Sequence, residues 1–276
     1  MTVLELEQLS VRFGGHLAVS DVSLRVEGGR VSGLIGPNGA GKTTTFNAIC
    51  GVVTPSGGRV TLDGNEITKV GTHKRARLGI GRTFQRLEVF SSLTVRENIQ
   101  VGLEIRRSWS RRRAALPQYL ADGGDPSPAE EIDLILDRLD LGPLADVSVG
   151  SLPTGHARLV ELGRALAARP SILLLDEPAS GLDDNETDAF GDLLGVLASN
   201  GLGILLVEHD VALVMRVCTQ LSVLDFGQVS ASGPPEVVRA NEAVLAAYLG
   251  TAPAATDHDS GADPAGAPVS SNGATP

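Results

Sequence analysis

A glycine-rich segment near the N-terminus, residues 36–43, restricts the chain to few architectures. It reads GPNGAGKT and fits the pattern G-x-x-x-x-G-K-[ST] in full. The apolar run at 31–35 before it predicts a buried strand, and residues 42–49 after it predict a helix. Glycine permits left-handed backbone conformations and close approach, so successive backbone N–H groups can point at phosphate oxygens. The segment therefore predicts an α/β fold with a phosphate site between a strand and a helix.

The loop also supplies the side chains that a magnesium-bound nucleotide needs. Lys42 would reach the β- and γ-phosphates, the Thr43 hydroxyl would bind Mg²⁺, and the helix N-terminus would add its positive dipole. The alternative is a purely structural glycine turn. The residues predicted to bind the nucleotide are Gly36, Pro37, Asn38, Gly39, Ala40, Gly41, Lys42, Thr43 and Thr44.

Two acidic residues, Asp176 and Glu177, follow directly after the apolar run 172–175. An apolar strand that ends in acids places them at the carboxyl edge of an open α/β sheet, where ligands bind. Asp176 is predicted to complete the metal site, and Glu177 to polarise the attacking water as a general base. An acidic pair after a strand can also be a helix cap or a turn. Its occurrence together with the loop at 36–43 favours the functional interpretation.

The rest of the chain predicts one large domain and a tail. Alternating apolar residues predict strands around 22–26 and 60–62. Further on, strands at 172–175, 202–207 and 221–225 alternate with helices at 186–198 and 210–217, which indicates a parallel sheet covered by helices. Residues 88–165 are predicted to form an inserted helical subdomain within a domain at 1–250. Residues 251–276 are too poor in large apolar side chains to fold and are predicted to be disordered.

Charge and composition exclude several classes of protein. The net charge of −10 argues against a nucleic-acid partner, since such proteins carry basic surfaces. Cys50 and Cys218 are too few for a disulfide scaffold and show no zinc-ligand spacing, and both are expected to be inert packing residues. No apolar run reaches the ~20 residues of a membrane span, and residues 1–5 lack signal-peptide character. We expect a protein that stays in the cytosol and that, if it works at a membrane, is held there by a partner.

Five segments occur in the order in which ABC transporter ATPases carry their motifs. They are the loop at 36–43, GRTFQ at 81–85, DEP at 176–178, SGLD at 180–183 and EHD at 208–210. Over about residues 3–250 the chain resembles that family. The resemblance implies a P-loop NTPase core with an antiparallel β-subdomain and an inserted helical subdomain. It also implies that ATP and Mg²⁺ are bound and that ATP hydrolysis drives transport.

The same resemblance implies roles for individual residues. Phe13 would stack on adenine, Gln85 would bind Mg²⁺ and sense a membrane subunit, and His209 would contact the γ-phosphate. Asp183 would act across a dimer interface. The residues alone leave alternatives, since Phe13 can be a core aromatic and a histidine after a strand can be a cap. The predicted catalytic residues are Glu177, His209 and Gln85, and the predicted metal ligands are Thr43, Gln85 and Asp176.

Finer features resemble one branch of the family. The segments at 79–85, 93–98 and 247–250 are similar to the ATPases of branched-chain amino acid importers. The alternative is a lipopolysaccharide-exporter ATPase, which shares the segments at 43–46 and 75–81. The importer resemblance implies three kinds of partner: a second ABC ATPase subunit, separate transmembrane permease subunits and an extracytoplasmic substrate-binding protein. Soluble ABC ATPases of translation or DNA repair usually have paired cassettes or a coiled coil, which the sequence does not predict.

One segment departs from the family pattern. Residues 152–156 read LPTGH where the family has LSGGQ, or LSYGQ in the branched-chain group. Pro153 replaces a serine whose hydroxyl would donate to the γ-phosphate held by the opposite subunit, and proline has neither a hydroxyl nor a backbone N–H. We therefore expect an asymmetric heterodimer in which the site formed by this chain's own loop is the active one. The alternative is a regulatory subunit that binds ATP and hydrolyses it weakly.

A basic stretch lies within the predicted helical subdomain. Its members flank Trp109 and are Arg106, Arg107, Arg111, Arg112 and Arg113. Such a run is usually a solvated helix face or loop. The alternative is a contact with anionic lipid headgroups or with an acidic partner.

Overall fold

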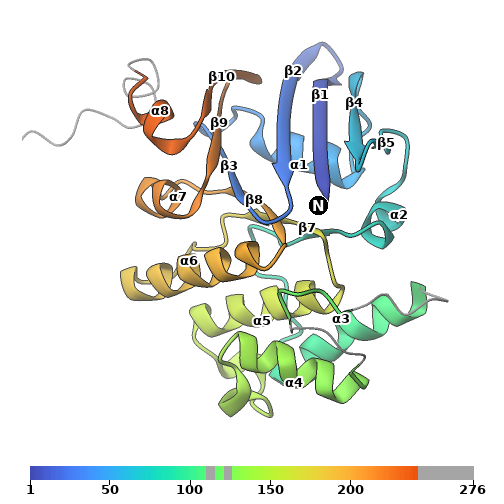
Figure 1. Cartoon of the computed structure of the whole chain (residues 1–276), viewed down its shortest axis with the longest axis vertical. Helices are drawn as coiled ribbons and strands as arrows, with labels where there is room; N and C mark the ends of the chain where they lie inside the picture. Colours follow the sequence, from blue (N-terminus) through green and yellow to red (C-terminus); the bar gives the residue numbers. More distant parts are fainter. Residues whose placement is uncertain (110–115, 121–125, 242–276) are drawn as a thin grey trace, which may run out of the picture.

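The computed structural model of the chain describes residues 1–109, 116–120 and 126–241. Two sheets occupy one end of the molecule, and a group of helices occupies the other (Figure 1). That group consists of α3 (Val95–Trp109), α4 (Pro128–Arg138) and α5 (Thr154–Ala167). In the described ranges, no helix has both the length and the hydrophobicity needed to cross a bilayer.

The larger sheet has six strands. In spatial order they are β10 (Gln228–Gly233), β9 (Gln220–Asp225), β3 (Val31–Ile35), β8 (Gly203–Val207), β7 (Ile172–Asp176) and β6 (Ile80–Arg82). All neighbours pair in parallel except β10, which is antiparallel to β9. Because β3, β8 and β7 are adjacent and share one direction, the segments that follow them meet at one edge of the sheet.

Both faces of this sheet are buried, and β7 shows how. Ile172 and Leu174 pack in a core formed with the second sheet and α1 (Lys42–Cys50), whereas Leu173 and Leu175 pack in a core formed with the helices. All four side chains are fully buried. Successive side chains of a strand point to opposite faces, so a strand buried on both sides has a continuous apolar sequence. That requirement explains the unbroken run before Asp176.

The second sheet is antiparallel. It consists of β2 (His16–Glu27), β1 (Val3–Phe13), β4 (Gly57–Leu62) and β5 (Asn65–Glu66), in this spatial order. One of its faces packs on the larger sheet through buried residues such as Leu6 and Val60. The other face is polar, with exposed ion pairs such as Arg59–Glu7. The chain thus has the antiparallel β-sheet that the family resemblance implies.

The remaining helices connect the strands. They are α2 (Thr72–Arg77), α6 (Asp184–Ser199), α7 (Val211–Val217), α8 (Pro235–Arg239) and two 3₁₀ turns at Gly142–Leu144 and Val149–Ser151. Helix α6 begins at 184 rather than at the predicted 186, because Asp183 and Glu186 form a capping box around its first turn. Helix α4 begins at Pro128 for the same reason, with Ser127 and Glu130 as the capping pair.

A buried ion-pair network holds the helical group to the larger sheet. Glu131 of α4 is 2% exposed and accepts two bonds from Arg106 of α3, of 2.5 and 2.6 Å. It also accepts a 2.8 Å bond from Arg169, which lies between α5 and β7. The Arg106 side chain is 16% exposed and is paired with Glu131, so the interpretation of the basic stretch as a solvated face or loop is wrong for Arg106. Arg107 is half exposed and pairs with Glu104 of its own helix, as a solvated face requires.

The predicted strands and helices at 31–35, 42–49, 172–175, 186–198, 202–207, 210–217 and 221–225 are confirmed, with shifts of one or two residues at their ends. Cys50 and Cys218 are buried free thiols, and burial raises the pKa of each, that of Cys218 to about 12. Their expected role as packing residues is confirmed. The predicted disorder of 251–276, the importer-like segment 247–250 and Arg111, Arg112 and Arg113 lie outside the described residues. The division into a domain at 1–250 with a helical subdomain at 88–165 stays a prediction.

Candidate functional site

The glycine-rich loop joins the end of β3 to the start of α1. A side chain at Gly36 would overlap the carbonyl oxygen of Leu224 in β9, so only glycine fits there. Gly41, with φ of 105°, is the N-cap of α1, and the first turn of that helix contains no acidic residue. The helix N-terminus therefore presents backbone N–H groups and a positive dipole with no carboxylate of its own first turn beside them. Thr43 lies on the exposed side of this turn.

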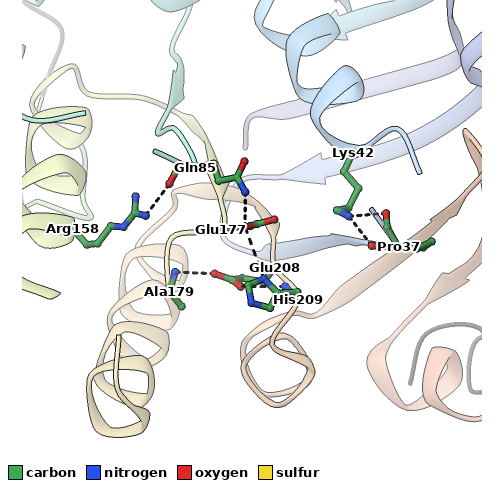
Figure 2. A network of polar contacts seen from close by, with 9 residues as sticks. Pro37, Lys42, Gln85, Arg158, Glu177, Ala179, Glu208 and His209 are labelled. Carbon is green, nitrogen blue, oxygen red and sulfur yellow. Dashed lines mark hydrogen bonds and ion pairs between the residues drawn. The ribbon is translucent and has the colours of Figure 1, made fainter. Parts of the chain in front are cut away.

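Lys42 lies across the loop. Its Nζ donates to the carbonyl oxygens of Gly36 at 2.6 Å and Pro37 at 3.0 Å (Figure 2). Partial burial lowers the pKa of the ammonium, while the charges of Glu177 and Asp176 act in the opposite direction. The charges of Glu177 and Asp176 therefore act on Lys42, although the loop and the two acids come from separate parts of the sequence.

Asp176 is the last residue of β7, and its side chain is 5% exposed. Burial raises the pKa of its carboxyl group, and the guanidinium of Arg82 opposes that shift. Arg82 Nη2 donates to Asp176 Oδ2 at 3.0 Å. The Thr43 hydroxyl, the Asp176 carboxylate and the Gln85 amide are all oxygen donors, which is the ligand chemistry that Mg²⁺ prefers.

Glu177 lies between Gln85 and His209 (Figure 2). Its Oε2 accepts a 2.9 Å bond from Gln85 Nε2 and lies 3.9 Å from His209 Nδ1. The backbone of Glu177 has φ of 48°, a left-handed conformation that is uncommon for a residue other than glycine and frequent at functional sites. The three predicted catalytic residues, which come from three different segments, therefore meet at one carboxylate.

Glu208 fixes the two segments that carry Glu177 and His209. It is 1% exposed, and its carboxylate accepts bonds from the backbone N–H of Ala179 at 2.8 Å and of His209 at 3.1 Å. Burial raises the pKa of this carboxyl group. His209 itself is 69% exposed, so its imidazole projects from the sheet edge into solvent. Exposure of this kind suits a residue that meets a ligand rather than one that fills the core.

Phe13 is the last residue of β1 and pairs with His16 across the turn to β2. Its side chain is 51% exposed, so the alternative that it is a core aromatic is wrong. An exposed aromatic ring provides a flat face for stacking on a base. Asp183 has a clear local role, because its side chain accepts from the backbone N–H of Glu186 at 2.8 Å as the cap of α6. Its predicted action across a dimer interface stays a prediction.

Comparisons with known proteins show which family the chain belongs to. A family model described as "ABC transporter" matches residues 19–180, and one described as "Branched-chain amino acid ATP-binding cassette transporter" matches residues 231–254. BraF of Pseudomonas aeruginosa, a high-affinity branched-chain amino acid transport ATP-binding protein, is 40% identical over 251 residues. The match covers 91% of this chain and 98% of BraF. The chain belongs to the ABC transporter ATPases.

Two further likenesses support the assignment. The lipopolysaccharide export system ATP-binding protein LptB of Haemophilus influenzae is 36% identical to this ABC ATPase over 250 residues, which is 91% of this chain and 98% of LptB. A solved structure of MJ1267, an ATP-binding cassette of an ABC transporter, superposes with a TM-score of 0.77 at 29% identity. It covers 91% of this chain and 100% of the other. The predicted fold and the predicted reaction, ATP hydrolysis by a transporter ATPase, are confirmed.

The departing segment of this ABC ATPase forms the N-terminus of α5. Pro153 is the N-cap of that helix, and no side chain caps it. A side chain at Gly155 would overlap the Glu186 carboxylate of α6, so a negative charge lies close to the helix end. His156 Nδ1 is buried and has no hydrogen-bond partner among the described residues. The helix end that the family directs at a nucleotide therefore lacks a serine hydroxyl and has a carboxylate beside it.

Sequence reasoning missed how the ABC ATPase holds the segment that carries Gln85. Arg158 of α5 donates to the backbone oxygen of Gln85 at 2.8 Å (Figure 2), and Arg164 donates to that of Glu88. Glu161 accepts from the backbone N–H of Glu88 at 3.3 Å. The spacing of three between Arg158, Glu161 and Arg164 indicates that they share one face of α5. The sequence does not say which segment that face contacts.

Proposed function

We propose that this ATPase binds magnesium–ATP in the loop at 36–43 and hydrolyses it at Glu177. The loop at 36–44, through its backbone N–H groups at residues other than Pro37, and the Lys42 ammonium would hold the β- and γ-phosphates, and Phe13 would stack on the adenine. Thr43, Gln85 and Asp176 would hold the metal ion. A bound Mg²⁺ neutralises charge on the β- and γ-phosphates.

Glu177 is proposed as the general base. Its carboxylate would polarise the attacking water. Gln85, which donates to Glu177 Oε2, would orient this base. His209, which approaches the same oxygen, would meet the γ-phosphate. The observation that most supports this proposal is that convergence on Glu177 Oε2. Phosphoryl transfer depends on positioning and charge neutralisation, so these residues are sufficient without a covalent nucleophile.

We further propose that the ATPase drives an importer of branched-chain or other hydrophobic amino acids. The likeness to BraF at 40% identity and the match of residues 231–254 to the branched-chain family model support this cargo. The likeness to LptB at 36% supports a lipid-type exporter as the second candidate.

The proposed assembly contains four kinds of subunit. Two ABC ATPase chains, this one and a different partner, would lie at the cytoplasmic face of the plasma membrane. They would bind transmembrane permease subunits, which would receive substrate from an extracytoplasmic binding protein. Gln85 and the helical group would pass the closure of the ATPase dimer to the permeases. The unlike partner is proposed because Pro153 lacks the hydroxyl donor of serine and would weaken the helix end that serves the opposite nucleotide.

Copurification followed by an ATPase assay tests the transport proposal. The chain is purified with its partners from solubilised membranes, and phosphate release is measured with a panel of amino acids and with lipopolysaccharide. Stimulation by leucine, isoleucine or valine supports the importer. Stimulation by lipopolysaccharide alone, with no binding protein in the complex, supports the exporter and overturns the importer proposal.

A further inference from the structure

Arg82 is the last residue of β6 and stands three positions before Gln85. Its side chain is 11% exposed, and its guanidinium makes two hydrogen bonds to different elements. Nη2 donates to Asp176 Oδ2 at 3.0 Å, and Nη1 donates to Asn47 Oδ1 at 2.6 Å. One planar cation therefore joins the end of β7 to helix α1, whose N-terminus forms the phosphate loop.

The same guanidinium lies against two aromatic rings. Its central carbon is 5.7 Å from the ring centre of Phe46 and 5.1 Å from that of Phe84. Phe46 is fully buried in α1, whereas Phe84 is half exposed and directly precedes Gln85. Arginine stacks its planar guanidinium on rings while its fork donates to carboxylates and amides, whereas lysine has one compact ammonium and no planar fork. Arg82 thus contacts α1, the end of β7 and the Gln85 segment at once.

Two further observations separate this arrangement from an ordinary buried ion pair. Arg82 Nε is buried and has no hydrogen-bond partner among the described residues, and the guanidinium also acts on the buried Cys50 thiol of α1. The backbone beside it is fixed, because Thr83 N–H donates to the Leu174 oxygen of β7 at 2.9 Å. Beyond Thr83, the Phe84 ring is the part of the Gln85 segment that touches the guanidinium.

We propose that Arg82 is a positioning residue that aligns the Asp176 carboxylate with the phosphate loop and couples it to the position of the Gln85 segment. The inference rests on the proposed nucleotide site, in which Asp176 and Gln85 hold the metal ion. When the Gln85 segment moves, the Phe84 ring moves with it, and the guanidinium transmits that displacement to Asp176. Arg82 touches neither nucleotide nor water in this role.

Calorimetry of nucleotide binding tests the role directly. ATP is titrated into the purified full chain in EDTA and then in excess Mg²⁺, for wild type, Arg82→Lys, Phe84→Leu and the control Arg59→Lys. Arg59 pairs with Glu7 on the exposed face of the small sheet. For Arg82→Lys we expect affinity in EDTA within twofold of wild type and at least a tenfold loss of the Mg²⁺-dependent gain. Phe84→Leu, which keeps the ion pair, loses the gain by less, about two- to fivefold.

Hydrogen exchange of residues 83–88 supplies the second readout. We expect faster exchange in Arg82→Lys and Phe84→Leu and unchanged exchange in Arg59→Lys. A full Mg²⁺-dependent gain in ATP affinity in Arg82→Lys overturns the inference. Equal losses of ATP affinity with and without Mg²⁺ in both variants also overturn it, because they indicate general destabilisation. Failure of wild type to bind ATP with Mg²⁺ overturns the proposed function itself.

Discussion

Two helix N-termini of this chain, those of α1 and α5, differ in their caps and in the charges around them. Each begins at a glycine-containing segment that the family uses to bind phosphate. At α1 the loop carries the Lys42 ammonium, which lies across it. At α5 the cap is Pro153, and the Glu186 carboxylate lies against Gly155.

The difference shows that a helix N-terminus alone does not make an anion site. Both helix ends expose backbone N–H groups and carry a positive dipole. A cation beside α1 adds to that field, and a carboxylate beside α5 subtracts from it. In the proposed heterodimer the α1 end serves this chain's nucleotide and the α5 end serves the partner's. The chain would therefore give one complete half-site and one weakened half-site.

The largest effect is expected from Glu177→Gln in the assembled complex. Gln keeps the shape and the contact with Gln85 but removes the base, and a general base contributes about 10²- to 10⁴-fold. We expect phosphate release to fall at least about a hundredfold while magnesium–ATP still binds. Glu66→Gln, an exposed substitution on β5, is the control and should leave the rate unchanged. Turnover above half of wild type would place hydrolysis at the other site.

A smaller effect is expected from Pro153→Ser. Serine restores a hydroxyl donor at the cap of α5, and a hydrogen bond to a charged group is worth about 1.5–3 kcal/mol. Because that bond forms at the partner's nucleotide, turnover of the complex should change by less than about tenfold. Steady-state phosphate release measures it. A rise of several orders of magnitude would show that the α5 side limits the reaction and would remove the asymmetry.

The smallest effect is expected from Glu186→Gln. Gln also serves as the third residue of a capping box, so α6 should keep its N-terminus while the charge beside Gly155 is removed. A charge at a helix end is worth about 0.3–1 kcal/mol, so the ATP concentration for half-maximal turnover should fall by no more than about fivefold. Glu236→Gln in the first turn of α8 is the matched control. A rise in that concentration would contradict the repulsive role of Glu186.

Much of the fold could be predicted because local patterns specify it. The run 172–175 is apolar on both faces because both cores cover β7, and Gly36 and Gly41 appear where backbone segments touch. Helix ends were less predictable, since α4 and α6 begin where side-chain caps form rather than where apolar periodicity starts. The pairing of Arg106 was not predictable, because its partner Glu131 lies 25 residues away and leaves no periodic signal.

The candidate site also has a part that the sequence predicts and a part that it does not. Lys42, Thr43, Asp176 and Glu177 were predictable because each belongs to a short motif with its own chemistry. The contacts of Arg82 with Asp176, of Arg158 with Gln85 and of Glu186 with Gly155 were not. Each joins segments that only the folded sheet brings together, and one sequence carries no record of such pairs.

Calorimetry of ATP binding to the isolated chain in excess Mg²⁺ tests the central claim most directly. Wild type should bind one ATP, and Lys42→Ala should bind at least about tenfold more weakly, because an ammonium with charge-assisted bonds to phosphate is lost. Lys69→Ala, an exposed substitution outside the loop, should bind as wild type does. No heat of binding from folded wild-type protein, or equal affinity in Lys42→Ala, would contradict the nucleotide site on which the account rests.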